Sequence, residues 1–395
     1  MDPRDFSFPS GALVKTVKGN PAFSPAILPP ALEFERDIVA LLSKADTALA
    51  ELSATGRHLP NPHLLIEPYV RREAVLSSRI EGTQTSLAEL LLEEVREGPQ
   101  DRNKADLAEV RNYVTALEHG IQLLEKLPLS LRLVRELHRD LMKGVRGAHK
   151  TPGEFRTGQN IVGAKGQDEV TASYVPPPIG EMKAALAEWE KYLNTDDGLP
   201  TLIQCALQHV QFESIHPFWD GNGRVGRLLI TLFLISKGRL SQPLLYLSGF
   251  FEEHRQDYYD LLQRTRTRGE WGNWMRFFLT GVIETASEAA SQAYELVQIR
   301  EDYRQKMKSK AKALALIDHL LTNPYITVAR AQRLLEVSQP TARSAILALE
   351  DAKIIVNRSG RSWGRVYVAK EILDAIDVRP KGTGASKHTH AQAHS

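Results

Sequence analysis

Apolar residues recur at the spacing of an α-helix along most of this chain, which predicts a mainly α protein. This helical spacing holds over most of residues 32–127, and Asn61–Pro62 interrupts it. We therefore expect a module of several helices in this region. The first face consists of Leu32, Phe34, Ile38, Leu41, Leu42, Ala45 and Leu49. Further helices are predicted at 87–97, 104–127 and 131–143.

A short region with a different pattern follows these helices. Ile161–Val162 and Val170–Val175 are apolar runs on either side of the glycine-rich segment Gly163–Gly166, and Pro176–Pro178 closes the second run. Two such runs around a turn predict a small β-hairpin. The helical pattern then resumes, and we expect helices at 179–193, 201–214, 225–237, 252–265, 271–284 and 286–307.

The composition changes at 306–312, a basic and weakly apolar segment that predicts a domain boundary. Beyond it the pattern predicts three helices and then two strands, at 311–321, 328–335, 341–351, 354–357 and 365–368. From residue 381 small polar residues and histidines dominate, so we expect a disordered tail. The chain is therefore divided into an N-terminal extension (1–31), a helical module (32–127), a core (128–307), a small α/β domain (311–380) and the tail (381–395).

Composition and charge narrow the class of protein. Hydrophobic residues make up 42% of the 395 residues, which suffices for a core in each domain. Cys205 is the single cysteine, so no internal disulfide framework is expected and a reducing cytoplasm is favoured. The formal net charge of +2 does not favour bulk attraction to nucleic acid. No membrane partner is expected, because the longest apolar run, 228–235, is too short to cross a bilayer and 1–30 lacks a secretion-signal pattern.

The densest chemistry lies in residues 216–227, which read HPFWDGNGRVGR between two predicted helices. Gly221 and Gly223 flank Asn222, and two glycines around an asparagine allow successive backbone N–H groups to face one side as an anion-binding nest. The helix that follows adds its positive N-terminal end, so phosphate is the expected ligand. Arg224 and Arg227 lie three residues apart on its first turn and are expected to reach the same polyphosphate.

Two further side chains in this segment suit transfer chemistry. Asp220 offers a hard oxygen for Mg²⁺, an ion that needs few protein ligands when phosphate supplies others. His216 carries an imidazole that titrates near neutrality and suits a general base for an incoming hydroxyl. A Gly-Asn-Gly turn, a His-Pro loop or a pair of surface arginines is common on its own. Their combination within twelve residues favours a nucleotide site.

The same segment resembles the signature of the Fic family, His-x-Phe-x-Asp/Glu-Gly-Asn-Gly-Arg-x-x-Arg, at every specified position. The resemblance implies a helical fold and transfer of AMP from ATP, with Mg²⁺, to a hydroxyl of a target protein. Carried over by position, it implies that His216 is the catalytic base and Asp220 the metal ligand. The remaining positions would hold the phosphates of ATP: Gly221, Asn222, Gly223, Arg224 and Arg227. The kinase-like Doc branch carries other residues at the two glycine positions.

Residues 77–82, SSRIEG, are similar to the inhibitory pattern Ser/Thr-x-x-x-Glu-Gly/Asn of the same family. From spacing alone they also fit a plain helix end capped by Gly82. With the signature present, the resemblance implies that Glu81 lies beside Arg227 and occupies the place of the γ-phosphate. The predicted hairpin, at 160–175, resembles the family's flap, whose edge would hold an extended target segment. It also fits a surface hairpin without a role.

The small domain at 311–380 resembles a winged helix in the order of its elements, and its wing carries Arg358, Arg361 and Arg365. Duplex DNA is therefore retained as a possible partner, beside a protein-interaction role. A homodimer is also possible. The favoured interpretation is a protein adenylyltransferase that is autoinhibited by Glu81 and also modifies itself. The alternative is a DNA-binding transcriptional regulator in which the Fic domain senses nucleotide.

Overall fold

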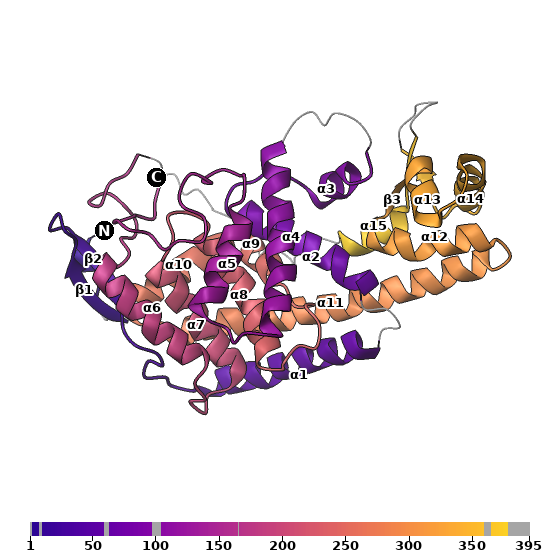
Figure 1. Cartoon of the computed structure of the whole chain (residues 1–395). Coiled ribbons are helices and arrows are strands. Elements are labelled where there is room, and N and C mark those ends of the chain that lie inside the picture. The colour runs from indigo at the N-terminus through magenta and orange to yellow at the C-terminus, as the bar shows by residue number, and fades with distance from the viewer. Residues whose placement is uncertain are drawn as a thin grey trace, which may run out of the picture.

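The structure, a computed structural model, describes residues 2–7, 10–58, 63–96, 104–164, 166–358 and 365–377. Figure 1 shows a helical body with a smaller domain extending from one end. The body contains a short 3-10 helix (Pro3–Asp5), two strands, β1 (Gly11–Lys15) and β2 (Pro21–Pro25), and the helices α1 (Arg36–His58), α2 (His63–Ile80), α3 (Leu87–Glu93), α4 (Lys104–Leu124), α5 (Leu131–Leu141), α6 (Ile179–Leu193), α7 (Thr201–Ile215), α8 (Asn222–Ser236), α9 (Ser248–Glu253), α10 (Arg255–Arg268) and α11 (Trp271–Met307).

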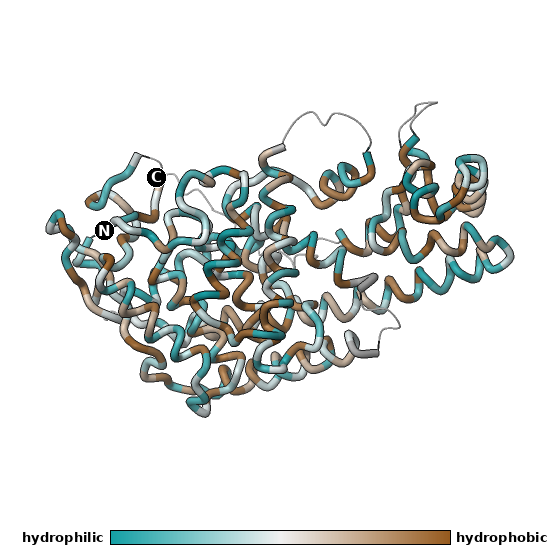
Figure 2. Tube along the Cα trace, in the orientation of Figure 1, coloured by the Kyte–Doolittle hydropathy of each residue, from teal (hydrophilic) through white to brown (hydrophobic). Residues whose placement is uncertain are grey.

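The core is built around α7 and α8, which are buried over nearly their whole length. Helices α4, α5, α6, α10 and α11 surround this pair, and the hydropathy tube in Figure 2 shows apolar residues concentrated there. Helix α6 begins and ends where the sequence pattern predicted. The loop between α7 and α8 carries the signature, so its ends are fixed by two helices that cannot move without opening the core.

The prediction of two helices at 271–284 and 286–307 is wrong, because α11 runs unbroken for 37 residues. No proline lies inside this range, and Ala286, where the second helix was expected to begin, is fully buried. The helix packs along α1 in its first part and against α12 in its last. Helix α11 therefore joins the body to the small domain as one continuous element (Figure 1).

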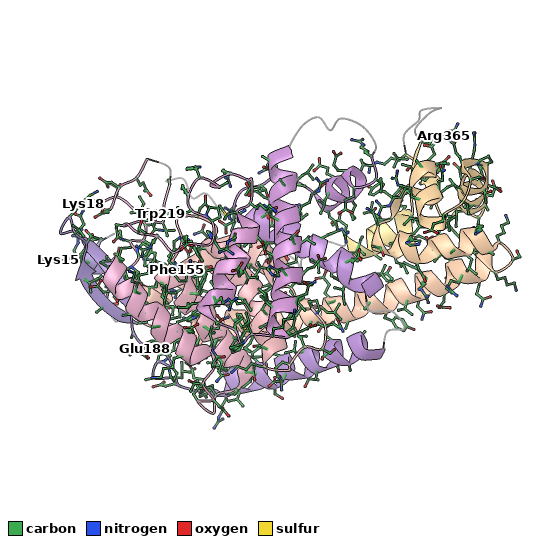
Figure 3. All side chains as sticks on the ribbon, in the orientation of Figure 1. Lys15, Lys18, Phe155, Glu188, Trp219 and Arg365 are labelled. Atoms are coloured by element: carbon green, nitrogen blue, oxygen red, sulfur yellow. The ribbon has the colours of Figure 1, made fainter. Side chains whose placement is uncertain are left out.

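The N-terminal extension contains the antiparallel strands β1 and β2, which the sequence pattern did not predict. The backbone N–H of Phe23 donates to the carbonyl of Val175 at 3.0 Å, and the Phe23 ring packs near that of Tyr174. At the hairpin tip, Glu169 accepts hydrogen bonds from Thr16 and Asn20 at 2.8 and 2.9 Å. Lys15 and Lys18 project from this end of the molecule (Figure 3). The N-terminal hairpin thus braces the segment that resembles the flap.

The expected two-stranded hairpin at 160–175 is reduced to a loop in the described residues. Its one bridge joins Val162 and Tyr174, with N–H to carbonyl distances of 2.8 and 3.0 Å. The residues between form turns, such as the one in which Asp168 accepts from Thr171. These turns satisfy backbone groups locally, so no longer ladder forms.

The small domain contains α12 (Ala311–Thr322), β3 (Tyr325–Thr327), α13 (Val328–Leu335), α14 (Gln339–Asp351), β4 (Val356–Asn357), β5 (Val366–Val368) and α15 (Lys370–Ile376). Its sheet has the order β3–β5–β4, all antiparallel, so it gains one strand beyond the two predicted. Asn323 donates from Nδ2 to the Leu91 carbonyl and to Glu94, both at 3.0 Å. The domain is thereby fastened beside α3, and α12 packs on α2.

The winged-helix resemblance and its DNA partner stay predictions. Arg358 donates to the Tyr325 hydroxyl at 2.5 Å and lies over that ring, 5.4 Å from its centroid, so this wing arginine contacts its own domain. Arg361 and the tail at 381–395 lie outside the described residues. No helix in the described part of the chain combines the length and the apolar character that a membrane crossing requires.

Candidate active site

The loop between α7 and α8 is held in shape by its own side chains. Asn222 accepts from the backbone N–H of Phe218 at 2.8 Å and donates to the Phe218 carbonyl at 2.9 Å. The Phe218 ring is fully buried and stacks on His138 with centroids 3.8 Å apart. The Asn222 side chain therefore stabilises the loop, and its role in binding phosphate stays a prediction.

The backbone of this loop requires unusual dihedral angles at two positions. His216 ends α7 with φ of 48°, and Gly221 precedes α8 with φ of 77°, both in the left-handed region. Glycine adopts this region without strain, whereas histidine does so at a cost, and such strained residues concentrate at functional sites.

The carboxylate of Glu81 lies directly against the glycine nest. A Cβ atom placed on Gly223 would come within 2.3 Å of Glu81 Oε1 and 2.9 Å of Arg227 Nη1. The loop-to-helix turn therefore accommodates an anionic oxygen only because residue 223 has no side chain. The sequence prediction that Glu81 lies beside Arg227 agrees with this geometry.

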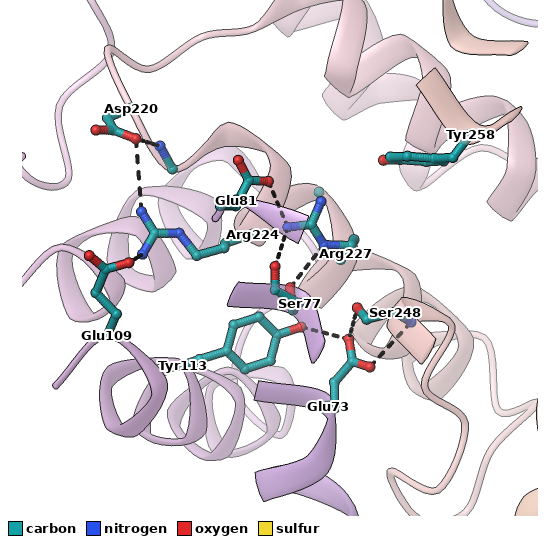
Figure 4. A network of polar contacts seen from close by, with 12 residues as sticks. Glu73, Ser77, Glu81, Glu109, Tyr113, Asp220, Arg224, Arg227, Ser248 and Tyr258 are labelled. Carbon is teal, nitrogen blue, oxygen red and sulfur yellow. Dashed lines mark hydrogen bonds and ion pairs between the residues drawn. The ribbon is translucent and has the colours of Figure 1, made fainter. Parts of the chain in front are cut away.

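Arg227 is held entirely by the end of α2 and the turn that follows it. Its Nη2 donates to Glu81 Oε1 at 2.7 Å and to the Ser77 carbonyl at 2.9 Å, and its Nε donates to Ser77 Oγ at 2.9 Å (Figure 4). Burial opposes ionisation of Glu81, but the charge of Arg227 outweighs it and lowers the pKa of this carboxyl. Glu81 is therefore a carboxylate at neutral pH.

Arg224 has a different partner from Arg227. Its Nη1 donates to Glu109 Oε2 on α4 at 2.9 Å, and its Nη2 lies 3.8 Å from Asp220 Oδ1. Arg224 and Glu109 are both almost fully buried, whereas the Asp220 side chain is 35% exposed. The two arginines predicted to reach one polyphosphate are thus each paired with a carboxylate of the N-terminal helical module (Figure 4). Sequence reasoning missed Glu109.

His216 is less basic than the sequence analysis expected. Burial, together with the positive charges of Arg266 and Arg156, lowers its pKa to about 3. The nearby Glu213 backbone opposes this lowering of the pKa but does not outweigh it. The ring is therefore neutral at pH 7, and one of its nitrogens is a hydrogen-bond acceptor. It can take up a proton without first losing one.

Arg156, which the sequence analysis did not assign, fixes the position of His216. Its Nε donates to the His216 carbonyl at 3.0 Å, and its Nη1 donates to the Gly158 carbonyl at 3.0 Å. Its backbone N–H donates to the Pro217 carbonyl at 2.9 Å. One buried arginine therefore joins the base of the flap-like loop to the residue at the centre of the site. The weak sequence signal was its place just before the predicted hairpin.

Glu213 is a buried carboxyl that lies against Gly226 of α8, and it was also missed from the sequence. Its Oε1 has no hydrogen-bond partner among the described residues. Burial raises its pKa to about 7 from an ordinary value of 4.5. Between these two pH values the folded protein retains a proton that the unfolded chain releases, so this group lowers the free energy of unfolding as pH rises.

Replacing Glu213 with glutamine should remove that pH dependence. We expect the variant to gain stability relative to the wild type as pH rises from about 5 to 8. The gain in the free energy of unfolding should be about 3 kcal/mol, because the pKa of the carboxyl is raised from 4.5 to about 7. Urea unfolding across this pH range measures the difference. Exchange of the exposed Glu181 for glutamine is the control. Parallel curves for wild type and Glu213→Gln would show that the carboxyl titrates normally.

The fold and this loop define a helical protein with an anion-binding turn at a helix N-terminus. Residues 39–122 match the model of the Fic/DOC family N-terminal region, and residues 128–234 match that of the Fic/DOC family. This chain therefore contains a Fic/DOC N-terminal region followed by a Fic/DOC domain.

Curated relatives are consistent with these family matches, and solved structures share the fold. The chain is similar to proteins named "Protein adenylyltransferase Fic" from Drosophila grimshawi, at 30% identity over 52% of this chain and 40% of that protein, and from Drosophila mojavensis, at 27% over 69% and 50%. It thus spans half or less of the length of these relatives. A crystal structure of a Fic family protein from Desulfovibrio desulfuricans has a TM-score of 0.57 at 21% identity, covering 86% of this chain and 98% of that one. Fic-1 (aa134–508) from C. elegans has a TM-score of 0.50 at 23% identity, covering 66% and 74%. These structures show the fold.

Proposed function

We propose that this protein transfers AMP from ATP to a hydroxyl group of a target protein, and also to itself. The proposal is based on the position of the Glu81 carboxylate, which lies against Gly223 and accepts a hydrogen bond from Arg227 at 2.7 Å. A site that holds one anionic oxygen between a glycine nest, a helix N-terminus and an arginine suits a phosphate group. The similarity to proteins named adenylyltransferases supports AMP as the group transferred.

In the proposed reaction, the hydroxyl oxygen of the target attacks the α-phosphorus of ATP. A new phosphorus–oxygen bond forms, the bond from the α-phosphorus to the bridging oxygen breaks, and pyrophosphate leaves. His216 takes the proton of the attacking hydroxyl, because its ring is neutral at pH 7 and a neutral imidazole has one acceptor nitrogen. Arg224 and Arg227 hold the β- and γ-phosphates of ATP, and the backbone N–H groups at Gly221 to Gly223 hold the α-phosphate.

Asp220 suits the role of Mg²⁺ ligand. Its Oδ1 accepts from the backbone N–H of Gly221 at 2.7 Å, which fixes the carboxylate next to the nest, and the side chain stays 35% exposed. No group of three or more metal-binding side chains gathers anywhere in the described ranges. A single fixed carboxylate matches an ion that takes its other ligands from phosphate and water. When bound there, Mg²⁺ would neutralise charge on the leaving pyrophosphate.

Glu81 keeps this site inactive in the proposed scheme. Its carboxylate occupies Arg227 and the Gly223 turn, so the γ-phosphate of ATP meets a negative charge where it needs a positive one. ATP would then bind with its phosphates displaced from the geometry of transfer. Because Glu81 lies in the turn that follows α2, a movement of this turn would break its pair with Arg227 and leave Arg227 bonded to Ser77 alone.

Incubation with ATP labelled in the α-phosphate tests the proposal. Wild type, Glu81→Gly and Glu81→Gly with His216→Ala are compared, in a cell lysate and alone, and mass spectrometry identifies any residue that gains AMP. We expect labelling by Glu81→Gly and none by the double variant. A protein that binds ATP but transfers no label in any lysate would contradict the enzyme and favour the DNA-binding regulator that senses nucleotide.

Replacing Asp220 with alanine should reduce both the rate and its dependence on Mg²⁺. In the Glu81→Gly background we expect a loss of about 100-fold at a fixed Mg²⁺ concentration, because charge on the departing pyrophosphate is then poorly neutralised. Initial rates over a Mg²⁺ titration measure the effect, and Asp374→Ala, at an exposed position on α15, is the control. If the rate of Asp220→Ala still rises with Mg²⁺ as before, another residue is the ligand.

A further inference from the structure

Two carboxylates of the N-terminal helical module contact the two signature arginines, but from different sides. The Glu81 side chain is 31% exposed and lies against the Gly223 turn, where an incoming nucleotide would meet it. The Glu109 side chain is 2% exposed and reaches Arg224 from α4, in the interior. The atoms nearest to a Cβ placed on Gly221 or Gly223 belong to Met142, His138, Glu81 and Arg227. Glu109 therefore supports its arginine from behind the nest.

The contacts of Arg224 leave part of its guanidinium available. Nη1 donates to Glu109, and Nη2 lies near Met142 Sδ, at 3.6 Å, and near Asp220 Oδ1, at 3.8 Å. Nε is buried and has no partner in the part of the chain that the structure describes. Arg224 is thus held at Nη1 by Glu109, while its Nη2 has only a sulfur contact and a longer approach to Asp220. Arg227, in contrast, has both its Nε and its Nη2 engaged by the segment that carries Glu81.

A buried arginine needs a buried partner to keep a single orientation. Ion pairs between groups removed from water are strong when hydrogen-bonded, and removal of one partner leaves the other charge uncompensated. Glu109 is the carboxylate within hydrogen-bond distance of Arg224, and Arg146, the next cation, lies 3.8 Å from its other oxygen. Arg224 therefore depends on Glu109 for its place beside the nest.

We propose that Glu109 is a positioning residue that orients Arg224 toward the β-phosphate of the nucleotide, so that Glu109 promotes productive binding while Glu81 opposes it. This inference rests on the proposed function of the same site. It predicts opposite outcomes for two neighbouring acidic residues. Loss of Glu81 strengthens nucleotide binding, whereas loss of Glu109 weakens binding of nucleotides that carry a β-phosphate.

The test compares binding of AMP and ADP, which differ by the β-phosphate, in the Glu81→Gly protein. Calorimetry with Mg²⁺ gives the ratio of the two affinities for Glu109→Gln, Glu109→Asp, Arg224→Ala and Glu109→Gln with Arg224→Ala. We expect Glu109→Gln to reduce the preference for ADP by about tenfold, the loss of one charge-assisted phosphate contact. Glu109→Asp should recover part of it, and Glu109→Gln should change nothing further once Arg224 is alanine. Glu118→Gln, an exposed position on α4, is the matched control.

Each outcome decides the inference. A higher ADP affinity in Glu109→Gln would make Glu109 a second inhibitory residue, and an unchanged ADP-to-AMP ratio would limit it to a structural role; both overturn the proposal. If Glu109→Gln does not fold, the ratio of ADP to AMP affinity is measured on Glu109→Asp instead. The shorter aspartate keeps the charge but moves Arg224. These readouts need no transfer of AMP. If the adenylyltransferase proposal fails, no protein will be labelled with AMP. The Glu109→Gln variant will still change the ratio of ADP to AMP affinity.

Discussion

Replacing Glu81 with glycine should raise the initial rate of AMP incorporation by about 10- to 100-fold. The pair between Glu81 and Arg227, at 2.7 Å, must break before a γ-phosphate can use the arginine, and a charge-assisted hydrogen bond of this kind corresponds to one to two powers of ten in an equilibrium. Initial rates with labelled ATP, on the protein itself and in a lysate, give the effect. The Glu81→Gln variant distinguishes the effect of the negative charge from the effect of the side-chain volume, because glutamine removes the charge and still covers Gly223.

The structure adds a stability effect to this prediction. Arg227 is 3% exposed and would keep only its bonds to Ser77 once Glu81 is gone, so the melting temperature should fall although activity rises. Saturating ATP should restore it, because phosphate replaces the lost carboxylate. Arg227→Ala should be weakly active with or without Glu81. A Glu81→Gly protein with unchanged labelling and unchanged melting temperature would contradict autoinhibition and leave residues 77–82 as a simple helix end.

Replacing His216 with alanine should abolish transfer, with a loss of at least about 100-fold in the Glu81→Gly background, and leave ATP affinity within about twofold. The imidazole acts on the incoming hydroxyl, whereas the phosphates are held by α8 and its preceding turn, which the substitution leaves in place. Calorimetry and initial rates separate binding from chemistry. His149→Ala, at an exposed position, is the control. A large loss of ATP affinity in His216→Ala would make the histidine a nucleotide ligand instead of a base.

The contiguous part of the site was predictable from sequence, and the distant part was not. Residues 216–227 form one loop and the first turn of a helix, so the relation between His216, Gly223 and Arg227 follows from local geometry. The approach of Glu81 followed from a resemblance to a known pattern, because spacing alone indicated only a helix end. Glu109 and Arg156 lie 115 and 60 residues from their partners in the site. No local pattern distinguishes a buried glutamate on α4 from the charged residues on its surface.

The fold shows the same division. Helices with regular apolar faces, such as α6, were predicted with correct bounds, whereas β1 and β2 were missed because Gly, Pro and Ser interrupt their alternation. The split predicted near Thr285 failed because α11 continues with buried alanines at Ala286, Ala289 and Ala293, although the pattern of large apolar residues weakens there. The lowered pKa of His216 was also beyond the sequence, since it depends on burial and on Arg266 and Arg156.

The N-terminal hairpin has a consequence for dissecting this protein into fragments. The family matches begin at residue 39, yet Phe23 covers Tyr174 and Val175, and Thr16 and Asn20 satisfy Glu169. A fragment that begins at residue 39 would expose Tyr174 and Val175 to water. It would also leave the Glu169 carboxylate without two of its hydrogen-bond donors. A fragment that preserves the loop at 160–175 therefore has to include the strands β1 and β2. Borders drawn from sequence similarity would remove these two strands.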